Sequence, residues 1–356
     1  MADFSYLTST SAADALTRLD SFSAVIDARS ESEFAEDHLP GAINWPVLND
    51  AERHSVGLEY AEVSPFSATK RGAAIVLRNI AQLIDREVLQ LPREWRPLVY
   101  CWRGGKRSGT LALMLAQIGF KVQVVEGGYQ HYRRAVIKAL EELPAALTYR
   151  VVCGSTGAGK SRLLQVIRAQ GAQVLDLEAL ANHRGSVLGL VPGSSQPGQK
   201  QFESHVWNAL RGFDPERPVF VESESKKIGN LRVPLALMER MRNSPCIRLD
   251  MPLEGRVGLL MQDYDYFVSD TPTFCARLDA LRSFRGHEVV NGWQEAARAG
   301  GTESVFRDLL VMHYDPAYAQ SMKRNFSGVS TLLADLSWDG SDASLERAAA
   351  CAIAAG

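Results

Sequence analysis

Cysteine is scarce in this chain, and the five cysteines stand far apart, at positions 101, 153, 246, 275 and 351. None of them forms the Cys-x-x-Cys spacing of zinc or redox motifs, so we expect reduced thiols, a cytoplasmic protein and no zinc site. No apolar run approaches the length that crosses a bilayer. The first residues also lack the basic and apolar regions of a secretion signal, so we expect no contact with a membrane.

The chain also lacks an excess of charge of one sign. Lys and Arg together number 39 and Asp and Glu together number 41, which gives a formal net charge of −2. Such a chain binds nucleic acid only through a local basic surface. Its 356 residues favour two domains over one core, and 46% hydrophobic residues with 22% charged residues are typical of a globular protein.

Short apolar segments alternate with helix-like segments in both halves of the chain. The segments that are typical of strands are residues 23–26, 98–100, 121–125, 149–153, 173–177, 218–221 and 246–249. This alternation predicts an α/β fold with parallel sheets. Pro144 interrupts a helix-like segment, so we expect a parallel-sheet domain at residues 1–144 and a doubly wound parallel-sheet domain at 145–356, with a helical, partly basic C-terminal region.

Cys101 directly follows the apolar segment 98–100, at the strand end where parallel sheets place their sites. Three basic residues and two glycines follow it at once: Arg103, Lys106, Arg107, Gly104 and Gly105. Cations and a helix start favour the thiolate, so we predict a nucleophile, and the glycines allow backbone N–H groups to turn inward around an anion. The alternative is a buried structural cysteine, which we disfavour because apolar burial would raise the thiol pKa.

Four short motifs follow one another in the order found in rhodanese domains. They are Asp27-x-Arg29 with Glu33-Phe34, His38-x-Pro40-Gly41-Ala42-Ile43-Asn44, the loop that begins at Cys101, and Glu126-Gly127-Gly128-Tyr129. On these motifs, roughly the first 140 residues resemble a rhodanese domain. We expect Asp27 and Arg29 to form a structural ion pair, and His38 to stabilise a turn through a hydrogen bond.

The cysteine loop is longer than in most sulfurtransferases. Five residues separate Cys101 from Arg107, whereas the commonest rhodanese pattern has four. The longer loop leaves room for a tetrahedral oxyanion above the thiolate. The same string satisfies the phosphatase pattern Cys-x-x-Gly-x-x-Arg-Ser, although Tyr100 stands where tyrosine phosphatases have histidine.

A second strand-to-helix junction carries a complete P-loop. Segment 149–153 leads into Gly154, Ser155, Thr156, Gly157, Ala158, Gly159, Lys160 and Ser161, and a helix is expected from Lys160 onward. The backbone amides of such a loop hold a diphosphate, and Lys160 caps the outer phosphates. The hydroxyl of Ser161 can reach a magnesium ion.

Polar residues follow the next strands. Where a P-loop ATPase ends a strand in a metal-binding aspartate, this chain has Glu222-Ser223-Glu224, whose carboxylates either serve the site or are simply solvated. Segments 182–186 (with Arg184), 196–203 and 225–229 are expected to form a rim of donors around the phosphate site. The arginines between 232 and 285, interleaved with aromatic residues, form either an RNA-binding surface or an ordinary amphipathic face.

A rhodanese-like half followed by this P-loop half resembles the bacterial tRNA 2-selenouridine synthases. The resemblance implies that sulfur of the wobble 2-thiouridine, in the anticodon arm of tRNA, is replaced by selenium from selenophosphate, which a selenophosphate synthetase supplies. It also implies geranylation of that sulfur from geranyl diphosphate, bound at the P-loop. Cys101 would carry selenium as a selenylated cysteine, while Arg103, Lys106 and Arg107 stabilise the departing phosphate. No prosthetic group is expected.

Two other functions fit the same motifs. One is a rhodanese-type sulfurtransferase with a nucleotide-binding second domain. The other is a cysteine-based phosphatase fused to a P-loop module.

Overall fold

The computed structural model describes residues 6–186, 189, 193 and 195–355. Their contacts divide the chain into two compact units. The first unit extends to Ala139 and includes Gly198–Asn208, and the second comprises Leu140–Pro197 and the residues from Ala209 onward. Each unit contains one five-stranded sheet, and every strand pair within these two sheets is parallel. The predicted α/β class with two parallel sheets is therefore confirmed.

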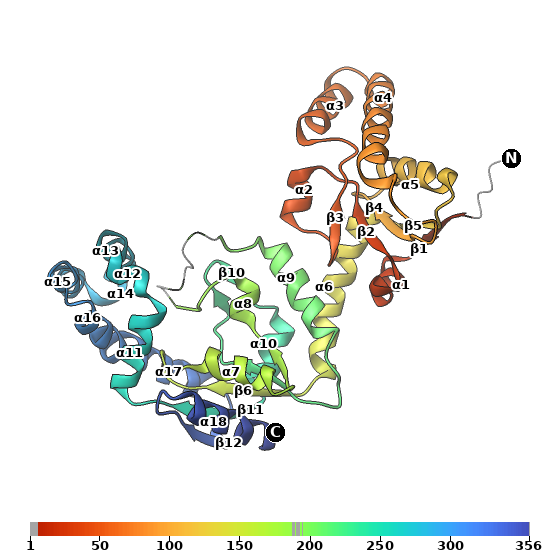
Figure 1. Cartoon of the computed structure of the whole chain (residues 1–356). Helices are drawn as coiled ribbons and strands as arrows, with labels where there is room; N and C mark the ends of the chain where they lie inside the picture. Colours follow the sequence, from red (N-terminus) through yellow and green to blue (C-terminus); the bar gives the residue numbers. More distant parts are fainter. Residues whose placement is uncertain (1–5, 187–188, 190–192, 194, 356) are drawn as a thin grey trace. The chain divides into compact units, whose positions relative to one another are not determined.

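The first sheet has the strand order β1-β5-β4-β2-β3 (Figure 1). The elements of this part of the chain are β1 (Leu7–Thr10), α1 (Ala12–Thr17), β2 (Ala24–Asp27), α2 (Glu31–Glu36), β3 (Ala42–Asn44), α3 (Asp50–Glu62), α4 (Pro65–Leu83), β4 (Pro97–Tyr100), α5 (Lys106–Ile118), β5 (Val122–Val125) and α6 (Gly128–Ala146). The central strand β4 lies between β2 and β5. Cys101, the residue that follows β4, therefore lies at the carboxyl end of the middle strand.

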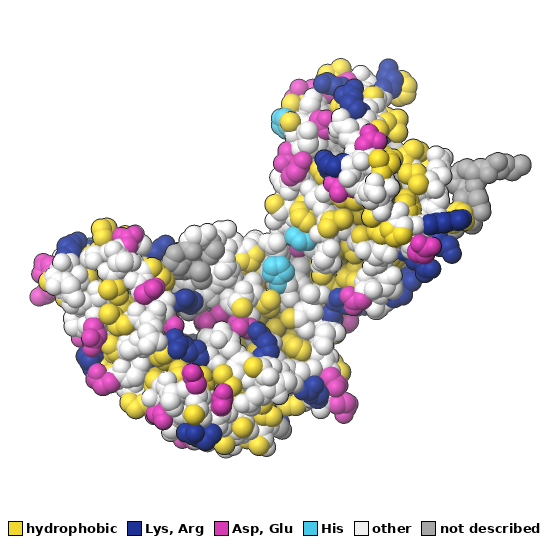
Figure 2. All heavy atoms as spheres, viewed as in Figure 1, with side chains coloured by type: hydrophobic (Ala, Val, Ile, Leu, Met, Phe, Trp, Pro, Cys, Tyr) yellow, Lys and Arg dark blue, Asp and Glu magenta, His cyan; other side chains and the backbone are white. Residues whose placement is uncertain are grey.

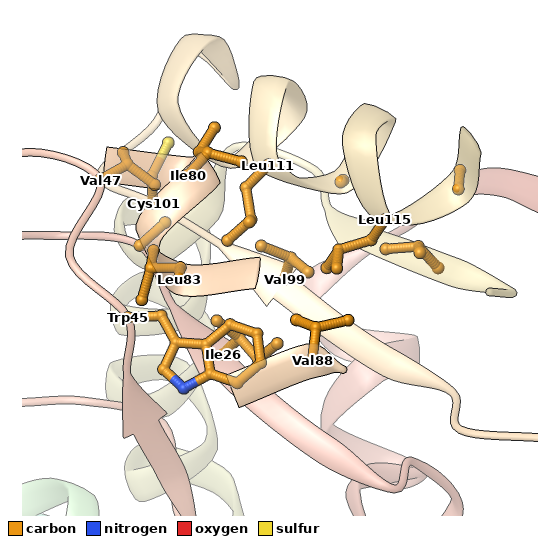
Figure 3. Packing of buried hydrophobic residues seen from close by; sticks show 14 of the residues in the cluster. Ile26, Trp45, Val47, Ile80, Leu83, Val88, Val99, Cys101, Leu111 and Leu115 are labelled. Atoms are coloured by element: carbon orange, nitrogen blue, oxygen red, sulfur yellow. The ribbon is translucent and has the colours of Figure 1, made fainter. Parts of the chain in front are cut away.

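The core of the first unit packs α4 and α5 against this sheet. Ile26 and Val99 on the strands and Leu111 and Leu115 on α5 are fully buried in one cluster (Figure 3). Burial of each such side chain contributes about 1.5–3 kcal/mol. Cys101 belongs to the same cluster, so the first residue of the candidate loop is anchored by the core.

The predicted ion pair at the end of β2 is confirmed. The guanidinium of Arg29 donates to Asp27 Oδ2 over 2.6 Å, and both side chains are fully buried. Arg29 also donates to the carbonyl of Asp37. The Nδ1 of His38 donates to the carbonyl of Phe34 over 2.9 Å, as expected for a turn-stabilising histidine. These contacts fix the loops beside β4.

The predicted domain boundary differs from the structure in two ways. Helix α6 continues through Pro144 to Ala146, because a proline in the last turn removes one hydrogen bond without interrupting any later turn. In addition, most of α9 (Gln199–Leu210) belongs to the first unit. There Ser204 Oγ donates to Asp37 Oδ2 over 3.1 Å, and Lys200 pairs with Glu36. Such long-range pairs leave no signal in the local sequence pattern.

The second sheet has the strand order β12-β11-β6-β8-β7. The remaining elements are β6 (Tyr149–Cys153), α7 (Lys160–Ala169), β7 (Gln173–Leu175), α8 (Leu177–Ala181), β8 (Val219–Glu222), β9 (Lys227–Ile228), β10 (Leu231–Arg232), α10 (Leu235–Arg242), β11 (Pro245–Asp250), α11 (Leu253–Asp263), α12 (Asp265–Ser269), α13 (Thr271–Leu278), α14 (Arg282–Arg285), α15 (His287–Arg298), α16 (Thr302–Asp308), the π-helical segment Leu309–Tyr314, α17 (Asp315–Asn325), β12 (Gly328–Ser337) and α18 (Asp342–Ala354). Strand β6 is the central strand of this sheet, and the P-loop directly follows it.

Helices α11 to α16 form a separate cluster beside the second sheet (Figure 1). Tyr264 and Phe267 are buried in this cluster. Arg256 and Arg282 pair with Asp315 and Asp279, respectively. Tyr264 and Phe267 therefore follow the amphipathic alternative, in which aromatic rings fill a core, whereas Phe284 is 68% exposed.

The surface is mixed in charge. On the face of the second unit that Figure 2 shows, Lys and Arg side chains are dispersed among Asp and Glu side chains. This distribution agrees with the net charge of −2. Among the described residues, no helix combines the length and the apolar character that a membrane span requires.

Candidate active site

The first candidate centre is the loop between β4 and α5. Cys101 is buried, with 3% of its surface exposed, and its Sγ accepts a hydrogen bond from Ser108 Oγ over 3.2 Å. The sulfur thus combines the apolar burial expected of a structural cysteine with one hydroxyl donor, and its role as a nucleophile stays a prediction. Gly105 has a φ of +72° and permits the turn into α5. Sequence reasoning gave Ser108 no role, although it lies in the first turn of the helix that follows the loop.

The cations of this loop have different surroundings. Arg107 donates to Glu33 Oε2 over 2.8 Å, and Arg53 also pairs with Glu33. Burial opposes the charge on Glu33, but these arginines, Arg107 first, hold its pKa below the ordinary value. Arg103 in the loop and Lys106, the first residue of α5, are both exposed. The geometry thus gives Arg107 a fixed orientation and leaves Arg103 and Lys106 accessible to an incoming anion.

The motif Glu126-Gly127-Gly128-Tyr129 packs against the backbone of the cysteine loop. The backbone N–H of Tyr129 donates to the carbonyl of Cys101 over 2.8 Å. A Cβ on Gly128 would lie 2.2 Å from that carbonyl oxygen, so only glycine fits there. The ring of Trp102 stacks on Tyr129 with a centroid distance of 5.5 Å. These contacts hold the loop at the end of the sheet.

The second candidate centre is the P-loop between β6 and α7. Gly157 and Gly159 have φ values of +78° and +84°, which L side chains rarely adopt. Lys160 is the first residue of α7, and its Nζ lies 3.4 Å from both the carbonyl oxygen of Ser155 and Glu222 Oε1. Burial opposes its charge, but the nearby carboxylates, Glu222 first, raise the pKa of Lys160 above the usual value. The ammonium therefore stays charged and can meet a phosphate.

Three carboxylates gather beside the P-loop. Oxygen atoms of Glu178, Glu222 and Glu224 lie within 4.8 Å of one another. Ser161 Oγ lies 3.1 Å from Glu178 Oε2 and 3.0 Å from Glu222 Oε2. Burial, and then the two neighbouring carboxylates, raise the pKa of Glu178 to about 10. This oxygen-only donor set fits the preference of Mg²⁺.

Glu178 was missed at the level of sequence. The segment 173–177 was expected to be one strand, whereas β7 ends at Leu175 and Glu178 lies in the first turn of α8. The available signal in the sequence was a carboxylate directly after the predicted strand 173–177. The structure shows that this strand pairs with β8, which carries Glu222. Glu222 and Glu224, in contrast, lie where the sequence suggested, and both face the P-loop pocket.

Without a bound cation, the second unit should lose stability as the pH rises through about 7. Burial, followed by the charge of Glu222, raises the pKa of Glu224 to about 7. The folded protein thus holds this proton more tightly than the unfolded chain, so the stabilisation is complete at acidic pH and is lost as the pH rises through the folded pKa. Denaturant titrations with chelator present, between pH 5 and 8 as an approximate window, should show this fall. Glu224→Gln should make the fall less steep, while Glu178, whose pKa is raised to about 10, maintains part of it. A rise in stability over that window would contradict the raised pKa.

Tyr318 of α17 closes the start of the P-loop. Its Oη accepts a hydrogen bond from the backbone N–H of Gly154 over 2.7 Å and lies 2.9 Å from Ser223 Oγ. Its ring centroid is 5.4 Å from Lys160 Nζ. Because α17 is distant in sequence, no local pattern identified this residue.

Tyr318→Phe should destabilise the second unit, since the substitution leaves the Gly154 N–H and the Ser223 hydroxyl without this oxygen. A buried group that loses its partner costs about 1–3 kcal/mol, so we expect a fall of that size in the free energy of unfolding. Chemical denaturation measures it. The matched control is Tyr60→Phe, which removes the hydroxyl of a tyrosine that is 56% exposed. Equal stabilities of the two variants would contradict the proposed clamp.

The P-loop lies in a pocket of about 680 Å³. Residues 182–186 and Ser225 line this pocket. Two of the three predicted polar segments, 182–186 and 225–229, thus contribute residues to it. Arg184 lies in this lining, 5.2 Å from the ring centroid of Tyr264. Segment 182–186 follows α8 and not a strand.

The third predicted segment, 196–203, does not form part of the rim. Gln196 donates to the carbonyls of Ala181 and Ile228, and most of the residues after it join the first unit. The prediction for this segment was therefore wrong, because α9 packs against residues far away in the sequence.

Comparisons with known proteins agree with both halves. The model of the tRNA 2-selenouridine synthase AAA domain matches residues 147–288, and that of the rhodanese-like domain matches residues 11–135. A tRNA 2-selenouridine synthase of Alcanivorax borkumensis is 32% identical over 332 residues, which cover 84% of this chain and 90% of the relative. Another, from Nitrosomonas europaea, is 37% identical over 246 residues, covering 67% of this chain and 63% of the relative.

Among solved structures, the N-terminal domain of a putative ATP/GTP binding protein from Clostridium difficile 630 is 32% identical. It covers 32% of this chain and 88% of its own, with a TM-score of 0.30. The match to the Alcanivorax relative runs through both units and through both candidate centres. On this basis, the chain belongs to the tRNA 2-selenouridine synthase family.

Proposed function

We propose that the protein is a tRNA 2-selenouridine synthase that first geranylates the wobble 2-thiouridine of tRNA and then exchanges its sulfur for selenium. The observation that carries this proposal is the presence, in one chain of this family, of a buried thiol at the start of a loop with exposed cations and of a P-loop pocket. The anticodon arm of tRNA is the proposed partner, and the cytoplasm is the proposed location.

The first step would take place at the P-loop. The 2-thio sulfur attacks the first carbon of geranyl diphosphate, the C–O bond breaks, and diphosphate leaves with the electron pair. The backbone amides between Gly154 and Gly159 and the ammonium of Lys160 stabilise the charge on the leaving group. This transfer requires no nucleotide hydrolysis.

A magnesium ion suits this step. Ser161 with Glu178, Glu222 and Glu224 would hold it, since a hydroxyl and three carboxylates are hard oxygen ligands. The bound ion would add positive charge beside the leaving diphosphate. Arg184, at the rim of the same pocket, is a further candidate for contact with the diphosphate.

The second step would use selenophosphate, supplied by a selenophosphate synthetase. The thioether formed in the first step is a better leaving group than the thiocarbonyl sulfur, so selenium can displace geranyl thiolate from the base. Cys101 is the proposed nucleophile toward selenophosphate, and the loop with Arg103, Lys106 and Arg107 would hold the phosphate oxygens.

The balance of electrons makes the selenylated cysteine testable. If the Cys101 thiolate attacks selenium, an S–Se bond forms, the Se–P bond breaks, and phosphorus leaves with the electron pair as phosphite. On this route a second thiol, which the assay must supply as reductant, then cleaves the S–Se bond, so that selenium stays on the base and the two sulfur atoms form a disulfide. If the thiolate attacks phosphorus, an S–P bond forms and hydrogen selenide leaves. Water then frees orthophosphate and restores the thiol. The phosphorus product therefore distinguishes the two routes.

The test is incubation of the protein with thiolated tRNA, geranyl diphosphate and selenophosphate, each omitted in turn. Mass spectrometry of the nucleosides should show 2-selenouridine only in the complete mixture, and S-geranyl thiouridine when selenophosphate is left out. Phosphorus NMR of the same mixture identifies the phosphorus product. Phosphite would indicate a selenylated Cys101, whereas orthophosphate as the sole product would indicate a phosphorylated cysteine instead. Thiosulfate turnover without RNA would instead favour the sulfurtransferase alternative.

A further inference from the structure

The P-loop pocket has two chemically different walls. One consists of the P-loop, the carboxylates and the polar segment 182–186. The other is apolar and is formed by α11, α17 and the residues next to them. Its members are Leu260, Tyr264, Tyr314, Ala317, Met322 and Phe326. A ligand that fills this pocket would therefore meet both charged groups and an apolar surface.

We propose that this apolar wall binds the hydrocarbon tail of the prenyl diphosphate and selects its length, so that Ala317 and Met322 are specificity-determining residues. The inference rests on the proposed function, because that function supplies the diphosphate at the P-loop. It adds where the tail lies and which residues limit it. A pocket of about 680 Å³ is within the range of small-ligand sites.

The wall is one face of α17. Ala317, Tyr318, Ser321 and Met322 follow the three-and-four spacing of a helix face, and all line the pocket together with Tyr314, the residue just before α17. Since Tyr318 contacts Gly154, this face begins beside the P-loop. Met322 follows one turn later and Phe326 two turns later, about 12 Å from Tyr318 by helical rise. The apolar surface thus extends away from the phosphate end.

The wall is also fixed in place. The guanidinium of Arg256 on α11 contacts Asp315 Oδ1 and Oδ2 over 2.7 and 2.9 Å and the carbonyl of Thr156 over 3.3 Å. One side chain therefore connects α11, the start of α17 and the P-loop. A Cβ on Gly157 would lie 3.4 Å from Leu260 Cγ, so the apolar wall starts directly at the phosphate loop. A preorganised wall of this kind discriminates ligands by length.

The apolar wall favours a prenyl tail over a nucleoside. A purine and a ribose carry several hydrogen-bonding groups, whose burial against Leu260, Met322 and Phe326 would cost free energy. Tyr264 offers no ready partner to a base, because it is buried and its hydroxyl lies 3.4 Å from Ser186 Oγ. Met322 is 4% exposed, and a thioether side chain adapts to the branched shape of an isoprenoid.

The test compares two insertions on opposite faces of α17. Ala317→Phe places a ring in the pocket, whereas the matched control Ala319→Phe places it on an exposed position outside the lining. We expect Ala317→Phe to weaken geranyl diphosphate binding about tenfold or more, with the affinity for inorganic diphosphate unchanged. Ala319→Phe should change neither. Calorimetric titration measures both affinities without any transfer reaction.

A second variant tests the length limit. Met322→Ala removes side-chain volume from the wall and should shift the ratio of kcat/KM for farnesyl over geranyl diphosphate upward by about tenfold. Equal effects of Ala317→Phe and Ala319→Phe, equal affinities of the unmodified protein for geranyl and inorganic diphosphate, or an unchanged farnesyl-to-geranyl ratio would each overturn the inference. Tight geranyl diphosphate binding without transfer to tRNA would overturn the proposed function and leave the tail site intact.

Discussion

Cys101→Ala should abolish selenium incorporation and leave geranylation intact, so that S-geranyl thiouridine accumulates in tRNA. The substitution removes the sulfur that accepts a hydrogen bond from Ser108, and this sulfur is the proposed nucleophile of the second step. Loss of a catalytic nucleophile lowers the rate by roughly 1,000-fold or more. Quantitative mass spectrometry of tRNA nucleosides, with the geranyl and selenium products measured in the same sample, gives both numbers.

The matched control is Cys351→Ser, because Cys351 is an exposed free cysteine on α18 of the second unit. It should retain both activities. Since Cys101 is part of the hydrophobic core, thermal unfolding of the Cys101→Ala variant must accompany the assay. A folded variant that still forms 2-selenouridine at the normal rate would contradict the role of this thiol.

Lys160→Ala should have the opposite pattern: geranylation falls by about 100-fold or more, because a cation aimed at the leaving diphosphate is lost. The substitution also removes the partner of Glu222 in a cluster of three carboxylates, which weakens anion binding further. The decisive measurement supplies tRNA that already carries the geranyl group. We expect Lys160→Ala to convert this tRNA to 2-selenouridine normally, since the second step uses the other centre.

Lys323→Ala is the matched control for the P-loop lysine, because Lys323 lies on α17 in the same unit but is exposed. It should geranylate at the normal rate. If Lys160→Ala fails on pre-geranylated tRNA as well, the two centres are not separate in function. Normal geranylation by this variant would refute the assignment of the diphosphate to the P-loop.

Much of the architecture followed from local sequence. The alternation of strands and helices gave the α/β class, and the junction from 149–153 into Lys160 placed the P-loop correctly. Gly157 and Gly159 adopt positive φ values, which residues other than glycine rarely adopt, so the residue type itself indicates this backbone conformation. The ion pair of Asp27 and Arg29 was also predictable, because the two residues are close in the sequence at a strand end.

Pro144 shows where local rules are insufficient. A proline predicts a helix end, but its cost in the last turn is small, so packing let α6 continue to Ala146. Helix α9 is a second case, because pairs with Glu36, Asp37 and Arg133 place it in the first unit. A sequence pattern reports which face of a helix is apolar and does not report what that face meets.

By itself, the sequence determined the cysteine loop and the P-loop, because a thiol among cations and a glycine-rich turn are encoded by adjacent residues. Only the tertiary structure decided what surrounds them. It brought Glu178 to Ser161, Tyr318 to Gly154 and the face of α17 to the P-loop. These partners are up to 164 residues apart in the chain, and their proximity depends on strand order and helix packing, which no local spacing records.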